Sequence, residues 1–360
     1  MIMNVEQLRE GMVLKEDVFS LTNSPIVSKK TVILNEHIEV LKAFFIEQVE
    51  IETKGEVQRE RKKEEQDLMD KAVPLNIKGD SFVKLYQNSI EQYKKEYLNW
   101  QAGSPVDIQK LRKLLLPTLQ KGLGEREILS LIYQDYRAEY QFVHPVAVAI
   151  LSGYIASKLK YKQADIIQIS LAGLLADIGM TKITSRNLYK KDILVADELA
   201  EIKKHPVYGY KAVSNVHSIQ EGVKYAVLQH HERYDGSGYP IGSKGSAIHP
   251  YAQIVAVADV YHAMTSERIY QKKKSPYKVL ETILQDEFGK FDITSVQALI
   301  DGMVKINHGN IIRLSNDEMA EILFVDQKNK FRPLIKLSET GEILNLAEKR
   351  YLYIDEVLAD

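Results

Sequence analysis

His230 to Pro240 reads HHERYDGSGYP, two adjacent histidines followed by a glycine-rich turn that ends in proline. Neutral imidazole is the commonest nitrogen ligand for mid-row transition metals. Two neighbouring histidines can serve one ion only where the backbone leaves regular helix or strand geometry, and Gly236 and Gly238 allow that departure. The stretch therefore predicts a metal site.

Further candidate ligands flank this stretch at regular intervals. His144, Asp177 and His205 precede it and Asp259 follows it, at successive intervals of 33, 28, 25 and, from His231, 28 residues. Each interval has about the length of a helix and a connection, so a helical bundle can bring one ligand from each helix to a common centre. A mixed set of His and Asp suits iron or manganese, whereas the absence of cysteine argues against zinc.

The segments around these residues resemble the HD-GYP family of bacterial phosphodiesterases. LAGLLADIGM (171–180), KHPVYG (204–209), the HHE stretch and ADVYHAMTSERIY (258–270) occur in the family's order and spacing. The resemblance covers about residues 130–308. It implies a helical domain of the HD superfamily that holds two or three iron or manganese ions. In that family a metal-bound hydroxide attacks a phosphodiester bond of cyclic di-GMP, a bacterial second messenger.

The resemblance also implies a role for each matching residue. Asp177 corresponds to the bridging carboxylate of the catalytic centre, and the other metal ligands correspond to His144, His205, His230, His231 and Asp259. The signature loop that shapes the substrate pocket corresponds to Arg233, Asp235, Gly236, Gly238, Tyr239 and Pro240. Arg268 corresponds to a residue beside a phosphate or base of the dinucleotide, although the basic cluster that it begins also fits a solvated helix end.

The sequence departs from the family pattern at positions that take part in metal binding and catalysis. The histidine of the family's His-Asp pair is Ala176 here, and the lysine three residues after the Asp is Met180. The carboxylate that trinuclear members place four residues before the first histidine is Tyr140. These losses favour one metal ion over two. His262 shares a helix face with Asp259 and is a candidate replacement for the missing imidazole, against the simpler interpretation of an ordinary polar residue.

Two functions from different classes fit this pattern. The first is a metal-dependent phosphodiesterase that acts on cyclic di-GMP or a related nucleotide and tolerates Ala176. The second is a catalytically inactive descendant that binds a nucleotide or a protein partner such as a diguanylate cyclase domain, which explains Ala176 and Met180 together. One ion would keep four donors in either case, namely Asp177, His205, His230 and His231.

Composition limits the class of protein. The 360 residues carry a net charge of -1, 27% charged residues and no cysteine, which excludes a disulfide framework and the overall basic field of a nucleic-acid binder. No apolar run has the length of a membrane span, and the start lacks a secretion signal. We therefore expect a cytoplasmic protein.

Segment patterns predict a mainly α protein with four parts. Residues 1–55 mix short apolar runs with one helical pattern and predict a small α/β module. Residues 56–125 begin as a charged linker and continue as amphipathic helices, which could mediate a homodimer. Residues 126–308 form the HD-superfamily helical bundle of HD-GYP type, and short β-like runs in residues 309–360 predict a small β-rich module.

Overall fold

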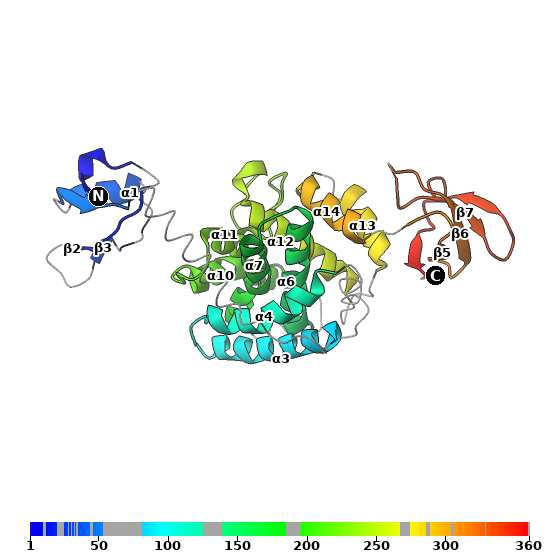
Figure 1. Ribbon diagram of the computed structural model, residues 1–360, viewed down its shortest axis with the longest axis horizontal. Coiled ribbons are helices and arrows are strands. Elements are labelled where there is room, and N and C mark those ends of the chain that lie inside the picture. Colours follow the sequence, from blue (N-terminus) through cyan, green and yellow to red (C-terminus); the bar gives the residue numbers. More distant parts are fainter. Residues whose placement is uncertain are drawn as a thin grey trace. The chain divides into compact units, whose positions relative to one another are not determined.

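A computed structural model describes residues 1–9, 12–19, 25–27, 29, 31, 33, 35–43, 46–52, 81–124, 139–184, 195–266, 274–285, 289–303, 306–327 and 329–358. The predicted charged linker (55–72) and Arg268 lie outside these residues. The chain divides into two compact units, Met1–Leu75 and Asn76–Asp360. Each unit is described by itself (Figure 1).

The first unit is a small α/β module, as the sequence predicts. Strands β1 (Ile2–Asn4) and β4 (Gln48–Glu50) pair antiparallel, as do β2 (Val18–Phe19) and β3 (Pro25–Val27). Helix α1 (Asn35–Ala43) packs with them. Leu14, Ile33 and Leu41 are fully buried at the centre of this module's own apolar core.

The second unit is a helical bundle, and its central helices are apolar on nearly every face. Helices α6 (Tyr140–Lys158), α7 (Gln163–Leu175) and α12 (Pro250–Thr265) pack together at its centre (Figure 1). A helix that is hydrophobic all round belongs in a core. Gly173 permits the close crossing of α6 and α7, because a Cβ there would lie 2.9 Å from the Val148 carbonyl oxygen. The mainly α fold is thus confirmed.

Other helices surround this centre. They are α3 (Phe82–Gln101), α4 (Ile108–Gly122), α9 (Ala196–Ile202), α10 (His205–Val213), α11 (Glu221–Gln229), α13 (Pro276–Gln285) and α14 (Ile293–Met303). The aromatic stripe of α3 is buried against α4 and α6, so it packs within the chain. One stretch, Gln163–Lys182, has the length and hydropathy of a membrane span, but 67% of it is buried, as expected of a core helix.

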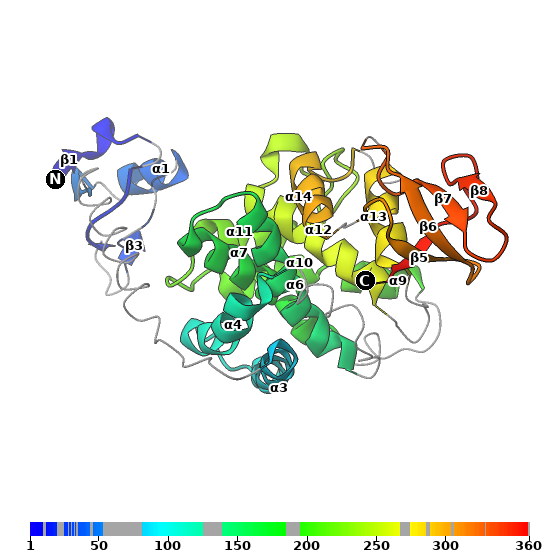
Figure 2. The same ribbon diagram turned by 45° about the vertical axis from the view of Figure 1, so that its right-hand side comes forward.

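The last segment is a five-stranded antiparallel sheet. Its order is β8 (Ile343–Asn345), β7 (Leu334–Leu337), β6 (Met319–Phe324), β5 (Ile311–Leu314) and β9 (Ile354–Val357). The sheet lies against α13 (Figure 2). Arg332 forms a buried ion pair with Glu281 of α13, and the Ser275 hydroxyl donates to the Ile354 carbonyl oxygen at 2.8 Å. The predicted β-rich module is therefore fixed to the helical bundle.

Candidate metal centre

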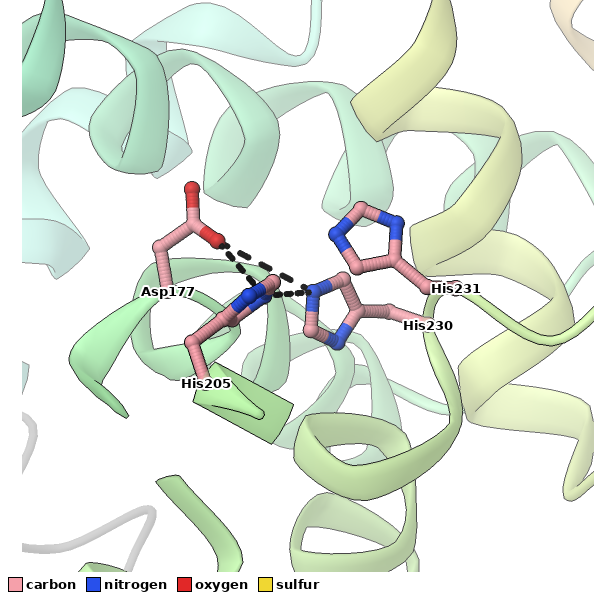
Figure 3. Close-up of side chains that lie close together, drawn as sticks. All are labelled: Asp177, His205, His230 and His231. Carbon is pink, nitrogen blue, oxygen red and sulfur yellow. Dashed lines mark hydrogen bonds and ion pairs between the residues drawn. The ribbon is translucent and has the colours of Figure 1, made fainter. Parts of the chain in front are cut away.

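Four of the six predicted ligands form one cluster (Figure 3). Asp177 lies between α7 and a 3-10 turn (Ile178–Lys182), His205 begins α10, and His230 ends α11 with His231 next to it. One donor atom from each of these four residues lies within 4.8 Å of the others. His205 and His230 are fully buried, whereas 22% of the Asp177 side chain and 18% of the His231 side chain are exposed, which opens the cluster on their side.

Glycine makes this convergence possible. A Cβ on Gly179 would lie 1.9 Å from the His205 carbonyl oxygen and 2.6 Å from the Gly209 nitrogen. The turn that follows Asp177 therefore presses directly on the first turns of α10. Gly238 is equally confined, because its Cβ would lie 2.4 Å from Glu232 Cα. At both glycines two backbone segments approach each other more closely than a residue with a Cβ atom permits.

Two histidines of the cluster have a fixed tautomer. The Nδ1 atom of His205 lies 2.8 Å from the Ile202 carbonyl oxygen, and the Nδ1 atom of His230 lies 2.9 Å from the Val227 carbonyl oxygen. A carbonyl oxygen only accepts, so each Nδ1 carries the proton and donates it. The two Nε2 lone pairs then face each other at 3.1 Å, with Asp177 Oδ1 at 3.3 Å from His205 Nε2 and 3.8 Å from His230 Nε2. With both histidines neutral these atoms are all acceptors, an arrangement that either a proton on His205 Nε2 or a metal cation completes.

The protonation states also suit a metal ion. Burial lowers the pKa of His230 to about 4 and that of His231 well below its usual value, so both imidazoles are neutral at pH 7. Burial alone would raise the pKa of Asp177, but the hydrogen bond and charge of His205 outweigh it and hold that pKa well below its usual range. Donors about 2.1 Å from one ion are separated by about 3.0–3.4 Å. The distances from His205 Nε2 to His230 Nε2 and to Asp177 Oδ1 fall in this range, at 3.1 and 3.3 Å, whereas the four donors together spread over up to 4.8 Å. The four residues could therefore hold one metal ion.

The other two predicted ligands lie beside this cluster. His144 on α6 has its Nε2 atom 2.8 Å from Asp259 Oδ1 on α12 and 3.7 Å from Asp177 Oδ2. Asp259 Oδ2 is 3.8 Å from His231 Nδ1. Burial would raise the pKa of Asp259, but the hydrogen bond from His144 outweighs it and holds that pKa well below its usual range. All six predicted ligands thus converge on one region.

His262 is buried and contacts His144, with their Nδ1 atoms 2.8 Å apart. Tyr140 stands where the trinuclear family members have a carboxylate, and the sequence indicated no other role for it. Its hydroxyl lies 3.0 Å from the same His144 nitrogen. The spacing of four residues between Tyr140 and His144 on a helix is a signal that could have predicted this contact. Ala176 is a buried methyl group beside Asp177.

The loop from Arg233 to Pro240 covers one side of the cluster. The Tyr239 ring stacks on His231, with ring centroids 4.8 Å apart and an interplanar angle of 27°. The Lys203 ammonium lies 5.3 Å from the centre of the same ring. Sequence reasoning missed Glu232, whose buried carboxylate accepts from the Ile241 and Gly242 amides at 2.7 and 3.1 Å and so fixes the loop.

The other predicted loop residues make contacts within the loop or with residues next to it. The Arg233 guanidinium donates to the His230 and Glu232 carbonyl oxygens at 3.3 and 2.9 Å and covers the Phe291 ring. The Asp235 carboxylate accepts from the backbone amide and hydroxyl of Ser237 on the surface. Gly236 has a positive φ of 86°, as the predicted turn requires. Pro240 follows Tyr239 through a cis peptide bond.

The bundle and its histidine–aspartate region define a class of protein. Residues 123–294 match the family described as HD domain. The middle of this chain is therefore similar to HD domains, and the predicted resemblance to the HD-GYP family is confirmed.

The chain is similar to several curated bacterial proteins. A cyclic di-GMP phosphodiesterase of Pseudomonas aeruginosa is 30% identical over 58% of this chain and 50% of its own length. A cyclic di-GMP phosphodiesterase response regulator of Xanthomonas campestris is 36% identical over 51% of this chain and 49% of its own length. A cyclic di-GMP phosphodiesterase of Thermotoga maritima is 39% identical over 41% of this chain and 40% of its own length. The chain thus spans half of these relatives or less.

Among solved structures, an HDGYP protein from Bdellovibrio bacteriovorus has a similar fold. The TM-score is 0.51 at 18% identity, and the match covers 84% of this chain and 98% of that one. At this identity the likeness concerns the fold alone.

Proposed function

We propose that this chain is a metal-dependent, HD-GYP-type protein that binds cyclic di-GMP or a related cyclic dinucleotide and hydrolyses it more slowly than its relatives do. One observation carries the proposal: the lone pairs of His205 and His230 face each other beside the Asp177 carboxylate, an arrangement that a divalent cation completes. The names of the relatives, which include cyclic di-GMP and 3'3'-cGAMP phosphodiesterases, support a cyclic dinucleotide as the ligand.

Asp177, His205, His230 and His231 would hold the ion. Bound there, iron or manganese would supply Lewis-acid stabilisation of charge on the phosphoryl oxygens. Tyr239 would form a wall of the substrate site. Burial, together with the charges of Asp177 and Asp259, raises the pKa of its hydroxyl above the usual range, so the phenol stays protonated and can donate to a phosphate.

The expected slow hydrolysis follows from Ala176 and Met180. The first removes an imidazole next to Asp177, and the second removes a cation from the following turn. Both changes weaken stabilisation of negative charge on the phosphoryl oxygens: the first because a neutral ligand that would help to hold a metal ion is missing, and the second because a cationic side chain is missing. Effects at one site are not additive, so the loss can exceed the product of two single losses.

A second candidate function is a catalytically inactive member that binds a nucleotide or a protein partner. Ala176 and Met180 favour it, because both changes impair chemistry while leaving the four-donor cluster and the loop in place. Contact with diguanylate cyclase domains, homodimerisation and a cytoplasmic location stay predictions. So do the roles of Arg268 and the other loop residues at the substrate.

The test is to purify the protein without oxygen, measure iron and manganese per chain, and assay the same sample for binding and cleavage of cyclic di-GMP. The control variant is His205→Ala, which removes one donor and should abolish metal retention. Metal with nucleotide binding and slow cleavage supports the proposal. If the nucleotide binds but is cleaved only after Ala176→His and Met180→Lys are introduced together, the second candidate is correct. Absence of both metal and nucleotide binding would refute the first candidate and the nucleotide-binding form of the second.

A further inference from the structure

The two halves of the histidine–aspartate region differ in whether neutral histidines can complete their hydrogen bonds. In the four-donor half, His205 and His230 present lone pairs to each other at 3.1 Å, because both Nδ1 atoms donate to backbone carbonyls. In the other half, His144 faces Asp259 at 2.8 Å. A histidine can donate and an ionised carboxylate can only accept, so this second contact is satisfied by a proton on His144 Nε2.

The surroundings of His144 Nδ1 agree with a proton on the opposite nitrogen. Tyr140 places its hydroxyl 3.0 Å away and His262 places its Nδ1 2.8 Å away, and both groups can donate. The Tyr140 ring stacks on the His144 imidazole, with centroids 5.0 Å apart and an interplanar angle of 23°. Ser266 lies 3.3 Å from both ring nitrogens of His262 and provides a further partner.

The reverse tautomer is unfavourable in this position. With the proton on Nδ1, the Nε2 lone pair of His144 would face the Asp259 carboxylate oxygen at 2.8 Å without a proton between them. His144 and His262 are both buried, so water screens such a contact poorly. The imidazole that could help to hold a second ion is absent, because Ala176 stands in its place.

We infer that Tyr140 and His262 are positioning residues that fix His144 as a hydrogen-bond donor to Asp259, so that the chain holds a single metal ion, at Asp177, His205, His230 and His231. The family resemblance implies two or three ions, and here an internal hydrogen-bond network replaces one of them. The inference rests on the metal centre of the proposed function.

The experiment changes the tautomer of His144 instead of removing its imidazole. His262→Asp substitutes a group that only accepts, which draws the proton of His144 to Nδ1 and frees Nε2. Ala176→His supplies the missing imidazole. The wild type, each single variant, the double variant and His144→Gln are purified without oxygen and reloaded with Mn²⁺. Ions per chain are measured by elemental analysis, and the magnetic coupling of neighbouring Mn²⁺ ions by electron paramagnetic resonance.

We expect one uncoupled ion in the wild type, in both single variants and in His144→Gln, and two coupled ions in the double variant. Two ions in the wild type, loss of the ion in His144→Gln, or a folded double variant that stays at one ion would overturn the inference. His144→Gln keeps the test decisive if the double variant does not fold. No ion in the wild type would instead refute the metal centre of the proposed function.

Discussion

Glu232 offers the sharpest test of how the loop beside the cluster is held. Its carboxylate is 2% exposed and accepts from two backbone amides, Ile241 at 2.7 Å and Gly242 at 3.1 Å. Hydrogen bonds to a charged group contribute about 1.5–3 kcal/mol each. Ile241 and Gly242 lie in an exposed part of the loop and can turn to water, which offsets part of the loss. We therefore expect Glu232→Ala to destabilise the loop by about 2–3 kcal/mol.

The assay is amide hydrogen exchange at Ile241 and Gly242 in the native protein, together with the affinity for cyclic di-GMP. A loss of 2–3 kcal/mol corresponds to exchange about 30- to 150-fold faster. Affinity should also fall, because the loop carries Tyr239. Asp235→Ala is the matched control for the exchange measurement: its carboxylate accepts from a backbone amide of the same loop but is exposed, so we expect unchanged exchange at Ile241 and Gly242. Equal effects of the two variants, or unchanged exchange in Glu232→Ala, would refute this explanation of the loop.

Three further predictions concern other contacts. Gly179→Ala should reduce metal per chain at least 10-fold, because its Cβ would meet a carbonyl oxygen of α10 at 1.9 Å; normal metal content by elemental analysis would contradict this. Arg332→Met should cost about 3 kcal/mol in urea unfolding, because Glu281 stays buried and, among the described residues, keeps only Lys278 as a charged partner. Replacing Glu281 by Met as well should recover most of that loss, and an additive double variant would count against the explanation. Lys203→Met should weaken cyclic di-GMP binding about 10-fold in calorimetry, with Lys204→Met as control; equal affinities would exclude a phosphate contact.

The fold and the ligand set were accessible from the sequence because both depend on spacing. Helix-length intervals between His144, Asp177, His205 and the His230 pair predict that separate helices converge, and the structure brings these side chains together. The glycines of the signature loop were likewise predictable, since a positive φ at Gly236 is a local requirement of the turn.

The chemistry within the site was less accessible because it depends on partners that no residue pattern encodes. The tautomers of His205 and His230 are fixed by the carbonyl oxygens of Ile202 and Val227, which any residue type could supply. Arg233 was predicted as part of the loop that shapes the substrate pocket, but the hydrogen bonds from its guanidinium to nearby carbonyl oxygens depend on the local backbone path.

The ion pair between Arg332 and Glu281 determines which pieces of this protein can be studied separately. A fragment that ends at residue 308 would contain all six predicted metal ligands but would lose the arginine that pairs with Glu281 and the sheet that packs against α13. Because α13 packs against α12, which carries Asp259, damage at the cut end would spread toward the centre. Inactivity of such a shortened protein could therefore result from damage to α13. It would not show whether the terminal sheet takes part in catalysis.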